Sequence, residues 1–151
     1  MQLQKIVVFL SSLGYGVASN AFTNEDLKGR FSYFNQVSDV ASLTVGVFDG
    51  TGNISEMEDI LINAPIGNGE RTLVTLKFNY GYYEVYPSGR GKMFVSLGEE
   101  GGPYYDPPAE ADFVVTGTNG REITALESFL MSGVGVADQL VAPSWKKIAD
   151  E

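Results

Sequence analysis

The densest group of side chains that could do chemistry in this chain lies between Tyr80 and Tyr86. Strand alternation would divide this segment between two faces, with Tyr80, Tyr82, Glu84 and Tyr86 on one and Tyr83 and Val85 on the other. Tyrosine rings inside a barrel would stack on a conjugated ligand and donate hydrogen bonds to its carbonyl or phenol oxygen. Tyrosine also suits the surface of any strand, so both interpretations stay open.

Candidates for acid or base catalysis come from the same strand patterns. Glu84 and Glu127 stand where an apolar residue would be expected. A carboxylate that faces a barrel interior has a raised pKa and can serve as an acid or a base; the alternative is that each carboxylate faces solvent. Lys77 and Asn79, on the polar face of the longest strand pattern, pose the same question. The catalytic candidates are therefore Tyr82, Glu84, Lys77 and Glu127.

The composition excludes several kinds of site. The chain has no cysteine and no histidine, so thiolate nucleophiles, sulfur metal sites and the Ser-His-Asp triad are ruled out. The segment 49–53 superficially resembles a calcium loop but lacks the spacing and the final glutamate of an EF-hand. No glycine-rich loop opens a helix, so a phosphate site is not supported. We predict neither a metal nor a cofactor.

The charge balance bears on the partners. The formal net charge of the 151 residues is −9, and the basic residues are scattered except for Lys146 and Lys147. Affinity for nucleic acid depends on Lys and Arg contacts to phosphates, so we expect no nucleic-acid partner. Hydrophobic residues make up 44% of the chain and aromatic residues 12%, which is enough for a real core in one domain over residues 22–151.

The elements that must position these side chains are strands joined by tight turns. Glycine-containing turns at 49–53, 87–91 and 117–121 each lie between runs rich in β-branched and aromatic residues, which is a strong hairpin signal. Residues 23–26 are expected to cap one short helical turn that ends near Gly29. The expected strands are 30–35, 41–48, 53–62, 71–86, 92–97, 111–116, 121–130 and a last run at 133–141 that would close the structure. We predict an all-β, closed antiparallel barrel of about eight or nine strands.

Two of these strands carry the clearest patterns. In 41–48, Leu43, Val45 and Val47 alternate with Ser42 and Thr44, the period-2 pattern of a half-buried strand. In 71–86, the apolar alternation slips near Gly81, which predicts a bulge or a barrel corner.

The loop 99–108 is too rich in proline and glycine for regular structure, yet it carries Tyr104 and Tyr105. These rings, with Trp145 near the end of the chain, would either cover a pocket or pack over a barrel end. The ligand-lining residues that we predict are Phe78, Asn79, Tyr80, Tyr83, Met93, Phe129, Tyr104, Tyr105 and Trp145.

Residues 1–21 have the features of a secretory signal peptide. Lys5 precedes an apolar stretch, and Ser19 and Ala21 form a plausible cleavage pair. The stretch is too short and too interrupted to span a bilayer, so we expect no membrane attachment after the signal is removed. The competing interpretation is a retained strand in a cytoplasmic protein, because Ile6–Leu10 also suits a buried β-run.

Several segments together resemble a group of small microbial β-barrel proteins similar in layout to lipocalins and to allene oxide cyclase. The segments are LKGRFSY at 27–33, VFDGTGNIS at 47–55, and GYYEV at 81–85 with Gly89 and Gly91. The resemblance covers most of residues 27–130 and rests on turn and strand motifs. It implies a lipocalin-like fold and activities such as those of fungal natural-product cyclases, including hetero-Diels–Alderases that work without a cofactor. No catalytic motif transfers residue by residue.

Three functions follow as hypotheses. The first is a cofactor-free cyclase that holds a hydrophobic polyketide- or terpenoid-derived molecule in a reactive geometry. The second is a carrier with the same pocket and no catalysis. The third is a secreted interaction protein whose barrel is filled by side chains. The expected partner is a hydrophobic small molecule, and homodimerisation is left open.

Overall fold

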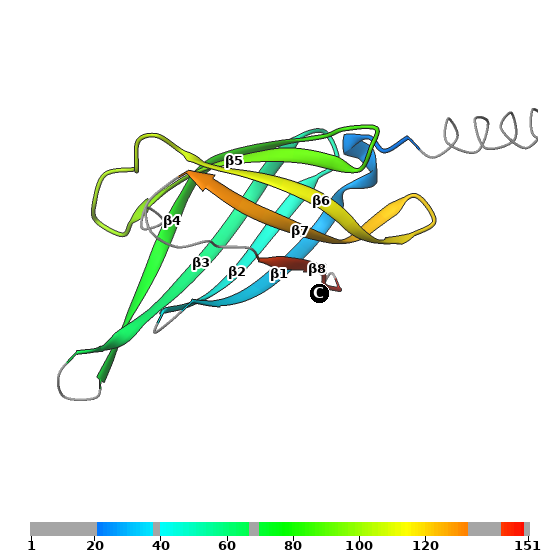
Figure 1. Ribbon diagram of the computed structural model, residues 1–151. Helices are drawn as coiled ribbons and strands as arrows, with labels where there is room; N and C mark the ends of the chain where they lie inside the picture. The colour runs from blue at the N-terminus through cyan, green and yellow to red at the C-terminus, as the bar shows by residue number, and fades with distance from the viewer. Residues whose placement is uncertain (1–20, 38–39, 67–69, 133–142, 150–151) are drawn as a thin grey trace, which may run out of the picture.

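The computed structural model describes residues 21–37, 40–66, 70–132 and 143–149, which form a closed antiparallel β-barrel (Figure 1). Its eight strands follow one another around the barrel in chain order. They are β1 (Lys28–Val37), β2 (Val40–Asp49), β3 (Asn53–Ile66), β4 (Glu70–Val85), β5 (Arg90–Glu99), β6 (Ala109–Asn119), β7 (Glu122–Ser132) and β8 (Ser144–Lys147). The predicted all-β barrel is confirmed. The predicted signal segment, apart from Ala21, lies outside the described residues.

The turn between β2 and β3 is organised by one carboxylate. Asp49 accepts hydrogen bonds from the backbone N–H groups of Thr51, Gly52 and Asn53, at 2.7, 3.1 and 3.0 Å. Gly52 has a φ of 113°, which glycine adopts without steric cost. Burial raises the pKa of Asp49, but hydrogen bonds from Thr51 and Asn53 outweigh it and hold the pKa well below its usual range. The turn thus uses its own carboxylate to fold two strands back on each other.

A bulge in β4 changes which residues face inward. The pairing of β4 with β5 shifts between Phe78 and Tyr80, so Asn79 is the extra residue. Phe78 packs against the core before the bulge, and Tyr83 is buried beyond it. Tyr80, directly after the bulge, is 47% exposed. The slip predicted near Gly81 is therefore confirmed, and its cause lies two residues earlier.

The barrel is closed by its shortest strand. β8 pairs with β7 through Trp145 and Leu126, and with β1 through Lys146 and Ser32. The sequence pattern placed the closing run at 133–141, which lies outside the described residues. The described closure falls on a segment that we expected only as a chain terminus.

One end of the barrel is covered by a short 3₁₀ helix, η1 (Asn24–Asp26). The predicted helical turn is present, but it ends at Asp26 and not near Gly29, which belongs to β1. The Asp26 carboxylate accepts a hydrogen bond of 2.9 Å from the backbone N–H of Thr23. Inside the barrel, the Tyr83 hydroxyl donates to the carbonyl of Leu27 at 2.7 Å and accepts from the N–H of Gly50 at 2.9 Å. A tyrosine of β4 therefore joins the segment after η1 to the β2–β3 turn.

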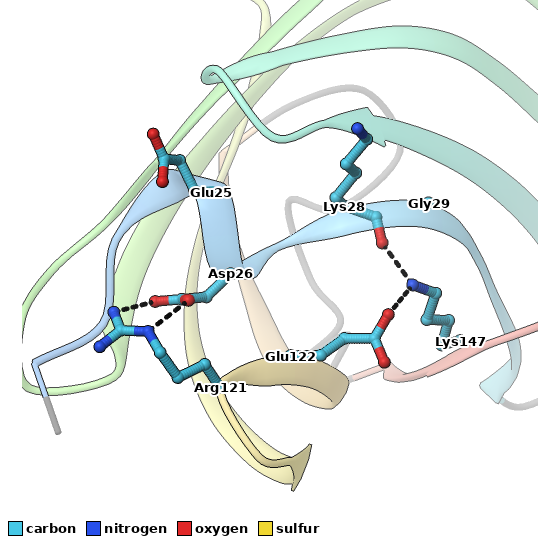
Figure 2. Close-up of a pocket in the computed structure, with 7 residues that line it drawn as sticks. All are labelled: Glu25, Asp26, Lys28, Gly29, Arg121, Glu122 and Lys147. Atoms are coloured by element: carbon cyan, nitrogen blue, oxygen red, sulfur yellow. Dashed lines mark hydrogen bonds and ion pairs between the residues drawn. The ribbon is translucent and has the colours of Figure 1, made fainter.

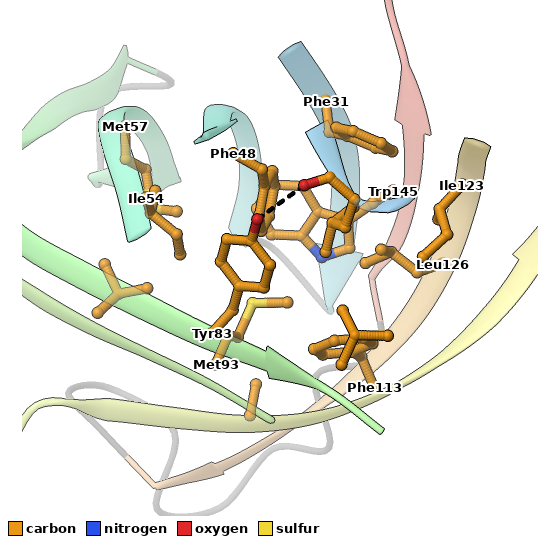
Figure 3. Close-up of a cluster of buried hydrophobic side chains, with 14 residues drawn as sticks. Phe31, Phe48, Ile54, Met57, Tyr83, Met93, Phe113, Ile123, Leu126 and Trp145 are labelled. Atoms are coloured by element: carbon orange, nitrogen blue, oxygen red, sulfur yellow. Dashed lines mark hydrogen bonds between the residues drawn. The ribbon is translucent and has the colours of Figure 1, made fainter. Parts of the chain in front are cut away.

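The core is built around Phe48, which makes edge-to-face contacts with three other rings (Figure 3). Its ring centroid lies 5.3 Å from that of Phe31, 5.2 Å from that of Tyr83 and 6.0 Å from that of Trp145. Such pairs are worth about 0.5–1.5 kcal/mol beyond the burial of their surface. We call Phe31, Phe48, Tyr83 and Trp145 the aromatic core.

Strand β2 turns its polar face toward this core. Thr44 is 1% exposed and Ser42 is 9% exposed, whereas Leu43 is 47% exposed. The alternation predicted for the strand is confirmed, and the structure shows which of its faces is buried. The reason is Phe48: β2 pairs with β1 without a register shift, so an inward Phe48 carries every second residue before it inward as well.

Candidate functional site

Four serine and threonine residues are buried among the described residues, and three of them, from β2 and β7, face the barrel interior; the fourth, Ser96 of β5, accepts a hydrogen bond of 3.4 Å from the Asn79 amide. Ser42 and Thr44 come from β2, and Ser128, which is 2% exposed, comes from β7. The Trp145 indole Nε1 donates a hydrogen bond of 3.0 Å to the Ser128 hydroxyl, so that hydroxyl keeps its own proton to donate elsewhere. We call Ser42, Thr44 and Ser128 the hydroxyl lining.

Two half-buried side chains of β1 lie beside the hydroxyl lining. Tyr33 pairs with Thr44 in the β1–β2 ladder, and Asn35 pairs with Ser42. The Tyr33 ring also contacts Trp145, with 4.4 Å between ring centroids. Hydroxyl, amide and indole groups therefore come from neighbouring strands, next to apolar side chains of the core. This combination suits a mainly apolar molecule that carries oxygen atoms.

The residues expected to do acid–base chemistry lie on the outer face of the barrel or are otherwise engaged. Glu84 and Glu127 are exposed, which is the solvent-facing alternative that the sequence left open. Tyr82 is 47% exposed. Lys77 is half-buried on the outside, where its ammonium donates to the carbonyl of Gly102 in the loop after β5.

Four of the predicted ligand-lining residues belong to the barrel interior. Tyr83, Met93 and Trp145 are buried in the core, and Phe78 is half-buried against it. The phenol of Tyr83 is engaged by its bonds to Leu27 and Gly50. The pKa of Tyr83 is raised to about 12, and burial makes the largest contribution to this rise. Tyr83 is therefore a neutral, structural side chain near neutral pH.

The other predicted lining residues lie outside the barrel. Tyr80 and Phe129 are exposed by 47% and 44%, and Asn79 is the exposed bulge residue. Tyr104 is 42% exposed and its ring lies under the Lys77 ammonium, 4.4 Å from it. Tyr105 is half-buried and donates a hydrogen bond of 3.0 Å to Glu99 at the end of β5. The structure thus separates the tyrosines that the sequence had grouped as one lining.

A solvent-open depression of about 400 Å³ lies where η1, β1, β7 and β8 meet (Figure 2). Arg121 holds Asp26 through two hydrogen bonds of 3.1 and 3.0 Å. Lys147 donates to the Lys28 carbonyl at 2.7 Å and pairs with Glu122. β8 ends here, so these side chains connect β1 with β7 where the backbone ladder stops.

The electrostatics of this depression are those of a structural junction. Burial raises the pKa of Asp26, but hydrogen bonds from Arg121 and Thr23 outweigh it and leave the pKa below its ordinary value. The hydrogen bond to Asp26 raises the pKa of Arg121 in return. The acids and bases that line the depression are largely paired with each other, so it offers little net charge to a ligand. The hydroxyl lining remains the better candidate site.

The sequence analysis missed the hydroxyl lining, although one signal was present. Ser42 and Thr44 were recognised as one face of a strand, but that face was not assigned to the interior. Phe48 lies four residues after Thr44 and so on the same face of the strand. It indicated that this face is buried, because a large aromatic residue is usually part of the core. Ser128 had no such neighbour signal in β7.

Within the described ranges, no group of three or more acidic side chains is close enough to hold a metal ion. No helix in those ranges is long and apolar enough to cross a membrane. The class that the fold defines is a closed eight-stranded antiparallel β-barrel. Comparison with protein-family models, curated proteins and solved structures found no match to this chain. The resemblance to lipocalin-like cyclases stays a prediction.

Proposed function

We propose that this protein binds a hydrophobic, oxygen-bearing small molecule at the hydroxyl lining and guides its cyclisation without a cofactor. One observation carries the proposal: β2 buries Ser42 and Thr44 while it exposes Leu43. Exposing leucine costs stability, because apolar surface is left in water. A barrel shaped only for packing would place leucine and valine at the inward positions of this strand. A ligand that carries oxygen atoms is the kind of molecule that would contact these inward hydroxyl positions.

The reaction class follows from where the ionisable groups lie. Glu84 and Glu127 face solvent, and the Tyr83 phenol is held neutral by structural bonds. The Ser128 hydroxyl and the Asn35 amide lie beside the core, and such neutral donors orient and polarise a carbonyl without removing a proton. A cycloaddition needs two reacting parts held close together, with hydrogen bonds to the oxygen that gains charge. This is the chemistry that a cofactor-free lipocalin-like cyclase would perform.

A carrier is the second candidate, and the position of the ionisable groups favours it: Glu84 and Glu127 face solvent, and binding alone needs no acid or base. The indole of Trp145 lies in the core beside Tyr33 and Phe48. A protein that only holds a flat apolar ligand beside Trp145 would need no more than this. The carrier and the cyclase share the same binding site and differ in turnover.

Binding is tested first, with β-ionone as the probe because it joins an apolar ring to a conjugated ketone. Trp145 is the only tryptophan, so its emission reports directly on the interior. We expect saturable quenching in the wild-type protein. Ser42→Leu, which fills the lining, is expected to abolish it. Leu43→Ser, the outward neighbour on the same strand, is the matched control and is expected to bind as the wild type does.

Turnover is tested with an ortho-quinone methide that carries a tethered alkene. The cyclase proposal predicts product in excess over protein and an enantiomeric ratio that differs from the reaction in buffer. Quenching of Trp145 without any change in rate or stereochemistry would favour the carrier. Quenching that survives Ser42→Leu would exclude the hydroxyl lining as the site.

A further inference from the structure

The outer face of β4 and β5 carries a row of exposed aromatic rings that the proposed interior site does not use. Tyr80 and Tyr82 are each 47% exposed, and the β4–β5 pairing runs without a shift from one to the other. Alternate residues on one face of a strand lie about 7 Å apart. The bulge at Asn79 directs both rings outward. Without it, Tyr80 would share the inward face of the strand with Phe78.

The ring of Tyr82 is held in place by a second ring. Phe94 of β5 is its ladder partner, and the two rings stack with 4.7 Å between centroids and 22° between planes. Phe94 covers one face of the Tyr82 ring, and the opposite face of that ring is open to solvent. Tyr82 therefore presents a fixed aromatic surface, which loses little side-chain entropy when something binds to it.

The row continues along β4 to the loop after β5. Tyr104 is 42% exposed and is fixed by Lys77, whose ammonium lies 4.4 Å from its ring centroid. A backbone bridge between Tyr104 and Gly98 attaches this part of the loop to β5, and Lys77 is the partner of Gly98 on β4. We call Tyr80, Tyr82, Tyr104 and Phe94 the tyrosine strip.

The surroundings of the tyrosine strip are polar. Its neighbours on the same outer face include the exposed Asn79 and Glu84. The half-buried Glu110 pairs with Phe94 in the β5–β6 ladder, and its carboxylate accepts a hydrogen bond of 2.9 Å from the Lys92 ammonium. Of the exposed aliphatic residues, Leu43 lies on β2, Leu73 on the far part of β4, and Val114 on β6, where it pairs with Arg90. The strip thus combines partly exposed aromatic rings with amide and carboxylate groups, and its centre contains no aliphatic side chain.

From this arrangement we propose that the tyrosine strip binds a linear, uncharged glycan. A pyranose ring has an apolar C–H face that stacks on an aromatic ring, and its hydroxyl groups donate to carboxylates and accept from amides. A row of rings along one strand fits an extended polymer, whereas small molecules require a concave site. The net charge of −9 repels acidic polysaccharides. The proposal is independent of the interior ligand.

The test is affinity electrophoresis of the full chain in native gels that contain barley β-glucan, xylan or hydroxyethylcellulose, with sedimentation on insoluble chitin and cellulose. We expect at least one of these glycans to retard or retain the wild-type protein. Tyr80→Ala, which removes a ring with no described ring partner, is expected to weaken binding about tenfold, and Tyr80→Ala with Tyr82→Ala is expected to abolish it. Tyr82→Phe keeps the stack with Phe94 and is expected to retain binding.

Phe34→Ala is the matched control, because Phe34 is an exposed ring on β1, outside the strip. It is expected to bind as the wild type does, with all variants checked for an unchanged thermal midpoint. The proposal is overturned if none of the five glycans binds, or if the double variant binds as well as the wild type. A lysine-rich peptide that binds at the strip in the absence of any glycan binding would also overturn it, in favour of a protein partner.

Discussion

The aromatic core and the hydroxyl lining occupy the same barrel but follow different rules. In the aromatic core, Phe48 contacts three rings and the Tyr83 hydroxyl both donates and accepts a hydrogen bond. In the hydroxyl lining, Ser42 and Thr44 occupy inward positions while Leu43 is exposed. The first arrangement gains stability from every group it buries. The second gives up apolar burial, and such a loss is expected where a protein binds something.

The largest effect on stability is expected in the aromatic core. Phe48→Ala removes the ring at its centre and leaves a cavity, so we expect a loss of about 3–5 kcal/mol in the free energy of unfolding. Ser42→Ala in the hydroxyl lining is expected to cost less than about 1 kcal/mol, because a small side chain replaces another. Denaturant unfolding of the two variants measures the contrast. Equal losses would show that the two regions do not differ as described.

Removal of one oxygen atom tests whether Tyr83 is structural. Tyr83→Phe leaves the Gly50 N–H and the Leu27 carbonyl without this partner, so we expect a loss of about 2 kcal/mol. Binding of β-ionone is expected to be unchanged, since the phenol belongs to the core. Loss of binding with little loss of stability would instead place Tyr83 in the ligand site.

The β2–β3 turn makes the stability of this end of the barrel depend on pH. The pKa of Asp49 is lower in the folded protein than in the unfolded chain, where it is about 3.9. Its contribution is therefore present above the unfolded pKa and is lost as the pH falls toward the folded pKa. Asp49→Asn is expected to cost about 1.5 kcal/mol at pH 7. The difference in the free energy of unfolding between Asp49→Asn and the wild type, measured by urea unfolding, is expected to become smaller from pH 5 to pH 2. A difference that is constant with pH would contradict this.

The smallest effect is expected at the junction of β1, β7 and β8. Lys147 pairs there with Glu122 and donates to the Lys28 carbonyl near the surface. Lys147→Met keeps most of the stem and removes the charge, so we expect a loss of less than about 1 kcal/mol, smaller still at high salt. Thermal midpoints at low and high salt measure it. A loss comparable to that of Phe48→Ala would mean that the junction, and not the core, holds the barrel closed.

The sequence predicted the barrel well because turns and alternation are local signals. The segment 49–53 contains its own hydrogen-bond donors and acceptor, so its sequence alone favours the turn. The slip in the longest strand was visible because Gly81 interrupts an apolar pattern. The closing strand β8 was not recognised, since four residues are too few for alternation to be seen.

The candidate site was harder to predict because alternation fixes which residues share a face but not which face is buried. Ser42 and Thr44 are inside only because Phe48 is, and that follows from ring contacts with β1, β4 and β8. Glu84 and Tyr82 are outside only because Asn79 adds one residue to β4. Both outcomes depend on pairings between distant parts of the chain, which composition and spacing do not reveal.

The most direct test of the central claim is the titration of Trp145 emission with β-ionone in the wild type, Ser42→Leu and Leu43→Ser. The two variants change adjacent residues of β2 that face opposite ways. We predict saturable quenching in the wild type and in Leu43→Ser, and none in Ser42→Leu, with all three proteins folded by circular dichroism. Equal quenching in all three, or none in the wild type, would contradict a ligand site at the hydroxyl lining.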